Sequence, residues 1–213
     1  MTRPTQRWQH ALLGLFVLFA FSVPGRGLAW GDLSLVKTHR LRLAATLGAF
    51  RISHDRFPGN YASRWNFPVG GIVQVRVKGF PILLSVRHFS QKRSSPAAVP
   101  QSSPSSPPRW KQTMFNLGVG TANSRMGRFQ SQVAFGLSID RIREPEPFPV
   151  TGQRSSTATG FFIMTEVEYF LLRGFSVGWQ FELSSAGAQK TAAFEANSVG
   201  GLYLGATLNV HAF

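Results

Sequence analysis

Hydrophobic residues alternate with small or polar residues along much of this chain, with a period of two. The clearest stretch runs over residues 161–171, where every second residue is apolar or aromatic, and another follows directly over 175–184. Because successive side chains of a β-strand point to opposite faces, this period predicts strands with one apolar and one more polar face. The same alternation predicts six further strands, over residues 40–52, 69–78, 82–90, 112–123, 129–140 and 202–211.

The predicted strands are joined by short and long connections in strict alternation. Three connections are tight turns that contain Gly79, Gly127 or Gly174, and glycine tolerates the positive φ of many turns. The other four are rich in Pro, Ser, Gly and charge, over about residues 53–68, 91–111, 144–157 and 185–197. This pattern predicts an all-β fold, an eight-stranded antiparallel transmembrane β-barrel, since about 9 to 11 residues suffice for a tilted strand to cross a bilayer.

A soluble sandwich or ligand-binding barrel could also contain eight alternating strands. In such a fold the apolar face fills the core and the polar face meets water. The polar face of this chain consists mainly of Gly, Ala, Ser, Gln and Thr, which suits the narrow interior of a small barrel. Charged residues make up only 15% of the chain, against about 25% in soluble domains. The membrane barrel is therefore favoured, and a soluble periplasmic ligand-binding barrel is kept as an alternative.

The N-terminal residues predict export. Arg3 and Arg7 precede an apolar run over residues 11–23, and small residues follow up to Ala29. This is the pattern of a secretory signal peptide with cleavage after Ala29, because the run is too short for a typical spanning helix. We therefore expect a signal peptide over residues 1–29 and a β-barrel domain over residues 30–213.

The charge of the chain is strongly positive. Lys and Arg number 23 and Asp and Glu number 9, which gives a formal charge of +14. Loss of residues 1–29 removes three arginines and no acid, and lowers this charge to +11. Such an excess favours an acidic partner. Since export places the protein outside the cytoplasm, we expect no nucleic-acid partner and favour anionic lipid or lipopolysaccharide.

Several kinds of chemistry are excluded by the composition. The 213-residue chain has no cysteine, which excludes a disulfide scaffold, a cysteine nucleophile and a thiolate zinc site. Its five histidines are scattered without the spacing of metal ligands. Gly118-Val119-Gly120 lies in a predicted strand without a following helix, so it is not a phosphate-binding loop. We expect neither a metal nor another cofactor.

The chain resembles the small bacterial outer-membrane barrels of the OmpA/OmpX type. The resemblance rests on the predicted signal peptide, the eight amphipathic strands, the alternating connections and the terminal Phe213. The resemblance implies a Gram-negative outer-membrane location, with both termini periplasmic and the long connections outside. It implies that Phe213 is the C-terminal aromatic signal read by the barrel assembly machinery. A role in envelope integrity, lipopolysaccharide contact or surface interaction follows from it, whereas the oligomeric state is left open.

Aromatic residues are predicted near both ends of the strands, where membrane barrels carry aromatic girdles. On this model Trp65, Phe67 and Trp110 lie at one rim, and Phe80, Phe129, Phe175 and Phe213 lie near the other. These girdles offer an explanation for the 19 phenylalanines, and a tight lumen offers one for the 21 glycines.

Charged residues also occur on the strand face that is predicted to point into the barrel. They are Arg76, Lys78, Arg87, Asp140, Glu166, Glu168 and Glu182. Since side chains just fill the interior of an eight-stranded barrel, we expect ion pairs that close the lumen. The paired glutamates could act as general acid and base only if a substrate could reach them.

The connection over residues 91–111 has an unusual composition. It contains six Ser and five Pro, which predicts a flexible, extended segment. It also contains Lys92, Arg93, Arg109 and Lys111 but no acid. If this connection faces outward, these cations lie where lipopolysaccharide phosphates lie and can bind them through charge-assisted hydrogen bonds. A solvated linker, whose charge only keeps it soluble, explains the composition equally well.

One motif suggests an enzyme. His88 and Ser90 share the apolar strand face of residues 82–86, so both side chains would point into the membrane near the outer rim. This arrangement resembles outer-membrane lipid A deacylases, small eight-stranded barrels whose catalytic His and Ser lie two residues apart on a strand. The resemblance implies lipid A acyl-ester hydrolysis, with His88 as the base that activates Ser90.

The match to these deacylases is incomplete. Gln91-Lys92 stands where that family has Asn-Ala, and the next predicted strand begins at Gln112 without the carboxylate that orients the histidine. The motif also lies in the second hairpin, whereas the family has it in the last. A His two residues before a Ser is common by chance, so an interfacial histidine near a loop serine is the favoured interpretation.

Overall fold

The computed structural model describes residues 40–53, 61, 63–78, 80–92, 109–121, 124–145, 153–188 and 199–212. The chain divides into a segment Met1–Val36 and a compact unit Lys37–Phe213, and every described residue belongs to the second. The predicted signal peptide, Arg93 and Phe213 lie outside the described residues.

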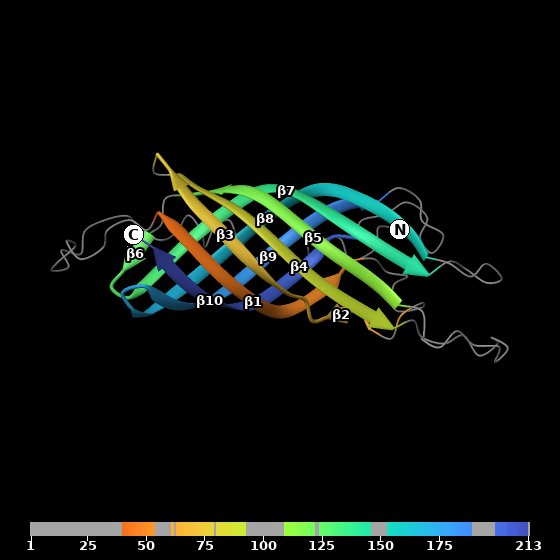
Figure 1. Ribbon diagram of the computed structural model, residues 1–213, viewed down its shortest axis with the longest axis horizontal. Helices are drawn as coiled ribbons and strands as arrows, with labels where there is room; N and C mark the ends of the chain where they lie inside the picture. The colour runs from red at the N-terminus through yellow and green to blue at the C-terminus, as the bar shows by residue number, and fades with distance from the viewer. Residues whose placement is uncertain are drawn as a thin grey trace, which may run out of the picture. The chain divides into compact units, whose positions relative to one another are not determined.

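The described residues form an antiparallel sheet of eight long strands that closes into a barrel (Figure 1). The long strands are β1 (Leu41–Ile52), β3 (Val69–Val77), β4 (Phe80–Lys92), β5 (Arg109–Gly120), β7 (Phe129–Pro145), β8 (Gln153–Leu172), β9 (Phe175–Ala188) and β10 (Gly201–Ala212). Two short strands, β2 (Trp65–Asn66) and β6 (Ser124–Met126), pair with β1 and β7 respectively. The first and last strands pair over their full length, from Leu41 opposite Ala212 to Ile52 opposite Gly201, so the main sheet has no open edge.

The eight predicted strands are all present, and their boundaries differ most in β8. This strand begins at Gln153, whereas the alternation of apolar residues begins only near residue 161. Residues 155–160 are Ser, Thr, Ala and Gly, so their sequence carries no apolar period even though they pair with β7. Backbone pairing therefore extends the strand beyond its apolar part. β5 likewise begins at Arg109, which places Arg109 and Lys111 on a strand rather than in a loop.

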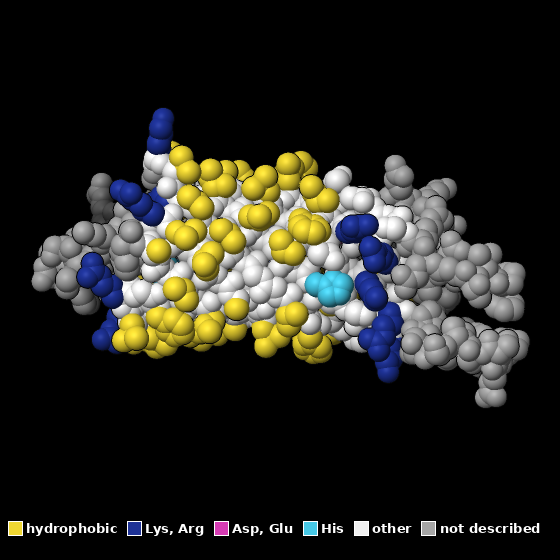
Figure 2. Space-filling view, viewed as in Figure 1, with side chains coloured by type: hydrophobic (Ala, Val, Ile, Leu, Met, Phe, Trp, Pro, Cys, Tyr) yellow, Lys and Arg dark blue, Asp and Glu magenta, His cyan; other side chains and the backbone are white. Residues whose placement is uncertain are grey.

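The two faces of the sheet have opposite character. Large apolar side chains such as Leu47, Phe135 and Val210 are exposed on the outside. On the face shown in Figure 2, apolar side chains form a broad belt across the middle of the barrel, with Lys and Arg at both ends of the belt. The inward positions hold Gln, Asn, Ser, Thr and charged residues. This arrangement is the reverse of the apolar interior that a soluble barrel requires. In the described part of the chain, no helix is long and apolar enough to cross a membrane.

The two ends of the barrel differ in their connections. Lys78 turns between β3 and β4 with a φ of 48°, and Gly127 turns between β6 and β7 with a φ of 61°. Together with the β8–β9 turn at residues 173–174, these turns define the short-turn end. The opposite end, where β1, β4, β7 and β9 finish, is called the long-connection end below.

The lumen contains two apolar clusters that lie at different levels. The rim cluster lies at the long-connection end and consists of Phe50, Ile52, Tyr61, Phe89, Trp110, Met114, Ile142, Ala158, Ala186, Val199 and Tyr203. The central cluster consists of Ala44, Ile72, Leu83, Ala134, Phe162 and Met164. Glycine makes room for it: a Cβ at Gly118 would lie 2.6 Å from the ring of Phe162. The tight lumen therefore accounts for part of the high glycine content.

The aromatic girdle prediction is only partly correct. Trp65, Phe67, Phe80 and Phe129 are exposed at the two ends of the belt, as predicted. Trp110 is instead fully buried in the rim cluster, where its ring packs edge-on against Tyr61 with centroids 5.5 Å apart. Its position is in phase with the inward residues Gln112 and Met114, so extending the alternation of β5 by one step places it inside. Several phenylalanines also fill the lumen, namely Phe50, Phe89, Phe162 and Phe170.

Candidate functional sites inside and outside the barrel

Arg42 is the centre of a buried polar network near the short-turn end. Its guanidinium forms an ion pair with Glu166 and a second with Glu168, whose oxygen lies 3.2 Å away. The same group donates hydrogen bonds to Asn209 Oδ1 at 3.1 Å and to Gln74 Oε1 at 3.0 Å. All five residues are buried. One arginine of β1 thereby joins strands β3, β8 and β10 across the lumen.

The two glutamates of this network have further partners. Thr207 donates a hydrogen bond to Glu166 at 2.8 Å, and Ser176 donates one to Glu168 at 2.8 Å. His211 Nε2 lies 3.1 Å from the same oxygen of Glu168. Buried carboxylates need such partners, because their removal from water is otherwise costly. The contacts engage both oxygens of Glu168 and Oε1 of Glu166, whereas Glu166 Oε2 is buried without a hydrogen-bond partner.

A second network is centred on Arg87, closer to the long-connection end. Arg87 Nη1 lies 2.9 Å from Glu182 Oε2, and Asn116 donates a hydrogen bond to the other oxygen of Glu182 at 2.8 Å. The Arg87 guanidinium also stacks over the ring of Tyr203, 4.2 Å from its centroid. Cation–π contact strengthens when the cation is desolvated, as it is here. This contact links the second network to the rim cluster.

Asp140 lies in a separate set of hydrogen bonds at a similar level. Gln112 donates to Asp140 Oδ2 at 2.9 Å, and Ser138 donates to Oδ1 at 3.2 Å. Trp110 in turn donates from its indole nitrogen to Gln112 at 3.3 Å. The side chains of the rim cluster and of the polar networks therefore interlock, and together they occupy the lumen.

The structure brings together most of the charged residues that the sequence assigned to the lumen. Arg87, Asp140, Glu166, Glu168 and Glu182 are all buried there. Arg76 lies on the inward face of β3 and is half-buried, but it forms no ion pair with a described carboxylate.

The prediction that Lys78 points into the lumen is wrong, because its side chain is exposed in the β3–β4 turn. The alternation ends where the chain leaves the sheet, so the parity that predicted an inward side chain no longer applies at this position.

The residue that organises the interior was missed. Arg42 lies between Leu41 and Leu43 in the predicted first strand, so its inward parity was readable from the sequence. His211 and Glu144 are also buried and were also missed. The partners of Arg42, in contrast, come from residues 32 to 167 positions away, and no local pattern indicates them.

The outer surface at the long-connection end carries a group of cations. We name Lys92, Arg109, Lys111, Arg141 and Arg143 the outer cation cluster. They lie on the outward face of neighbouring strands: Lys92 is opposite Arg109 across β4 and β5, and Lys111 is opposite Arg143 across β5 and β7. In Figure 2, Lys and Arg side chains form a band at this end of the apolar belt.

No acid accompanies these cations in the described part of the chain. The described carboxylates are Asp140, Glu144, Glu166, Glu168 and Glu182, and all of them are buried inside the barrel. The face shown in Figure 2 accordingly displays no acidic side chain. Charge is therefore sorted by face: both signs occur in the lumen, and only positive charge occurs on the described outer surface.

His88 and Ser90 lie on the outer face of β4, as their parity predicted. His88 Nδ1 lies 3.0 Å from the hydroxyl of Thr113 on β5, and Ser90 is paired with Lys111. A histidine that activates a serine normally needs an acid to orient it. Since every described carboxylate is in the lumen, none of them can orient His88. The described polar neighbour of the His88 ring is the Thr113 hydroxyl, on the outer face of the barrel.

Among the residues that the structure describes, no group of three or more His, Asp or Glu side chains has an arrangement that could hold a metal ion.

Only the comparison of folds finds similar proteins. No family model and no curated protein matches the chain. The structure is similar to that of Neisserial surface protein A, NspA, with a TM-score of 0.55 and 13% identity over 80% of this chain and 94% of that one. It is also similar to the outer membrane protein OprG from Pseudomonas aeruginosa, with a TM-score of 0.50 and 12% identity over 83% of this chain and 98% of that one. At such low identity, these likenesses show a common barrel fold.

Proposed function

We propose that this protein spans the bacterial outer membrane as a closed barrel and binds the phosphates of anionic outer-leaflet lipid, in particular lipopolysaccharide, through its outer cation cluster. The observation that carries the proposal is the outward group of Lys and Arg, without a described acid, at the border of the apolar belt. Lys and Arg bind phosphate through charge-assisted hydrogen bonds, and bilayer phosphates lie at such a border.

The location in the outer membrane has two lines of support. The exposed apolar belt and polar lumen fit a bilayer-spanning barrel. The structurally similar OprG is described as an outer membrane protein, and NspA as a surface protein. We propose that the long-connection end of the barrel faces the outside of the cell, so that the outer cation cluster lies in the outer leaflet. Export by a cleaved signal peptide predicts that the mature protein begins at Trp30, which N-terminal sequencing of the exported protein would test.

Binding to lipopolysaccharide can be tested with charge variants at the two ends of the barrel. The test variant is Lys111→Gln/Arg141→Gln/Arg143→Gln, and the matched control is Arg40→Gln/Lys78→Gln/Arg128→Gln, which removes the same charge from the short-turn end. Exposed charge contacts contribute about 0.2–1 kcal/mol each, so we expect the test variant to bind purified lipopolysaccharide about tenfold more weakly in zwitterionic nanodiscs. Equal affinities for the two variants would overturn the proposal.

The closed lumen is a separate part of the proposal. Its support is the interlocking of the Arg42 network, the Arg87 network and the rim cluster. A lumen filled with side chains gives ions no wide aqueous path. We expect purified protein in a planar bilayer to show no stable, large unitary openings, and such openings would contradict a closed barrel.

Assembly of the barrel completes the proposed function. We expect the barrel assembly machinery to recognise the C-terminal aromatic residue, Phe213. The substitution Phe213→Ser should lower the amount of folded barrel in outer-membrane fractions. This amount is measured as the heat-modifiable form on a gel. Unchanged folded amounts would remove Phe213 from this role.

A further inference from the structure

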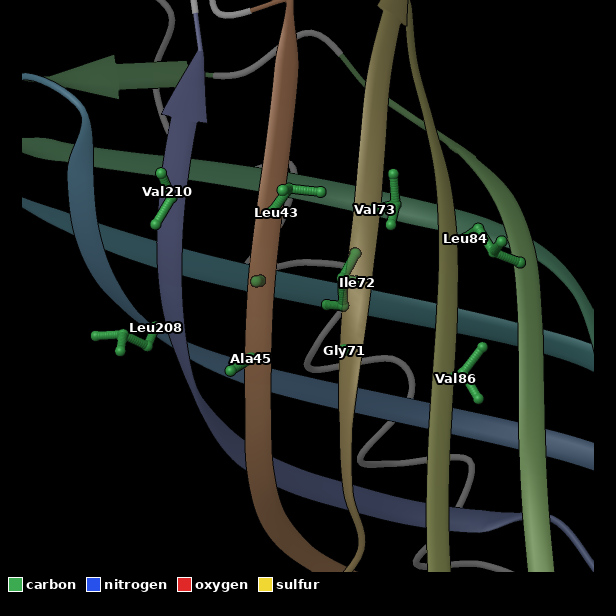
Figure 3. Close-up of a pocket in the computed structure, with 10 residues that line it drawn as sticks. Leu43, Ala45, Gly71, Ile72, Val73, Leu84, Val86, Leu208 and Val210 are labelled. Carbon is green, nitrogen blue, oxygen red and sulfur yellow. The ribbon is translucent and has the colours of Figure 1, made fainter.

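The described outer face of the barrel contains an apolar groove, of about 460 Å³, over strands β10, β1, β3 and β4 (Figure 3). Its exposed walls include Leu43, Val73, Leu84, Leu208 and Val210. The size of the groove is within the range of small-ligand sites, about 300–1,000 Å³.

The groove results from two small residues in one row of the sheet. Ala45 on β1 is opposite Gly71 on β3, and this pair lies between Leu208 and Val86 on the flanking strands. The neighbouring row, Val210, Leu43, Val73 and Leu84, has a large side chain on every strand. Figure 3 shows the two rows one above the other, with Ala45 and Gly71 in the middle of the lower row. The groove is thus a depression where two large side chains are missing.

Beyond the groove, the outward face of β4 leads toward the outer cation cluster. The outward positions of this strand after Val86 are His88, Ser90 and Lys92. Across the sheet, His88 is opposite Thr113, which is opposite Arg141. Apolar surface therefore gives way first to hydrogen-bonding groups and then to cations. In Figure 2, a histidine lies between the apolar belt and the band of Lys and Arg at this end.

The same order of groups occurs in a phosphorylated, acylated lipid, which has an acyl chain, then ester or amide linkages, then phosphate. We propose that the groove holds one acyl chain of the anionic lipid whose phosphates the outer cation cluster binds. His88 and Thr113 then face its linkage region as hydrogen-bonding partners. The inference rests on the proposed function and adds a chain-binding site to it.

A substitution that fills the groove tests the acyl-chain site. Ala45→Leu adds a large side chain at an exposed position in the small-residue row. The matched control is Val167→Leu, at an exposed position on β8, four strands from β3 in either direction around the barrel. Folding of each variant is checked by heat-modifiable gel migration. If Ala45→Leu does not fold, Gly71→Ala is used, because its Cβ would lie 3.2 Å from the Ala44 oxygen and needs only a small shift.

The two ligands compared are lipid A and its fully deacylated, phosphorylated headgroup, each titrated into nanodiscs of zwitterionic lipid. We expect Ala45→Leu to weaken lipid A binding at least about tenfold, the effect of a steric misfit in an apolar pocket, and to leave headgroup binding unchanged. Val167→Leu should bind both ligands as the wild type does. Lys111→Gln/Arg141→Gln/Arg143→Gln should weaken both.

These results separate the two proposals. Wild-type lipid A affinity in Ala45→Leu would overturn the acyl-chain site and leave phosphate binding intact. Unchanged binding of both ligands by the triple cation variant would overturn phosphate binding itself. A change in oligomeric mass caused by Ala45→Leu, measured by sedimentation in matched detergent, would identify the groove as an interface between copies of the chain and would also overturn the acyl-chain site.

Discussion

Arginine occupies two opposite settings in this barrel. Arg42 is buried in the lumen, where two carboxylates and two side-chain amides surround its guanidinium. Arg141 lies on the outer face of β7, opposite Thr113, and none of the described carboxylates lies on that face. The two residues therefore have the same charge but different available chemistry.

Arginine can therefore stabilise the fold in the buried setting and bind a ligand in the exposed setting. A guanidinium whose donors are already engaged holds strands together and cannot bind a further ligand without breaking those contacts. An exposed guanidinium keeps its donors for an outside anion, and it contributes little to stability. The location of the carboxylates, all inside in the described part of the chain, separates these two uses.

The largest expected effect comes from removing the buried arginine. Arg42→Ala leaves Glu166 and Glu168 buried without their cation, which costs about 3–5 kcal/mol of unfolding free energy. The measurement is urea unfolding in lipid vesicles, followed by tryptophan fluorescence. The control, Arg141→Ala, should change stability by less than about 0.5 kcal/mol, as is usual for surface substitutions. Similar losses of unfolding free energy in both variants would show that burial does not distinguish the structural role of Arg42 from that of Arg141.

The second network allows a double-mutant cycle. Arg87→Met and Glu182→Leu should each destabilise the barrel by about 3–5 kcal/mol, because each leaves a buried charge uncompensated. The double variant should be less destabilised than the sum of the two, since no uncompensated member of this ion pair remains. Strict additivity would show that the pair is not coupled inside the lumen.

A higher salt concentration should weaken the interactions of the exposed cations more than those of the buried ion pairs. Raising ionic strength from about 0.1 M to about 1 M shortens the Debye length from about 10 Å to about 3 Å and screens exposed charges most. We therefore expect binding of the deacylated headgroup to weaken severalfold, while the unfolding free energy of the barrel changes little. Headgroup binding that does not respond to salt would argue against a role for the exposed cations.

The smallest expected effect is at Lys78, which the sequence placed in the lumen and the structure places in a turn. Its φ of 48° is in the left-handed region, so Lys78→Gly relieves strain and should raise stability by up to about 1 kcal/mol. Lys78→Ala removes the charge but keeps the Cβ, and it should give no such gain. A large loss of stability in both variants would instead indicate that the charge of Lys78 belongs to a structural network.

The fold was largely predictable from the sequence because a period of two is a local property. The alternation within each strand indicates which side chains face outward. The inward position of Arg42 was readable within the strand predicted over residues 40–52, and that of Trp110 by extending the strand predicted from residue 112 by two positions. Partner choice was not predictable, because Arg42 and Glu166 lie 124 positions apart and meet only through closure of the sheet. The groove depends on register, since Ala45 and Gly71 are adjacent only after β1 and β3 pair.

The unequal strand lengths have a consequence for what the cell surface presents. β8 has 20 residues and β7 has 17, whereas β3 has 9. At roughly 3.3 Å per residue and a tilt near 45°, β8 rises roughly 47 Å, beyond the roughly 30 Å hydrocarbon core of a bilayer. In the proposed orientation, the β7–β8 ribbon extends past the hydrocarbon core at the long-connection end, and its Ser and Thr residues over 155–159 reach the polar headgroup region.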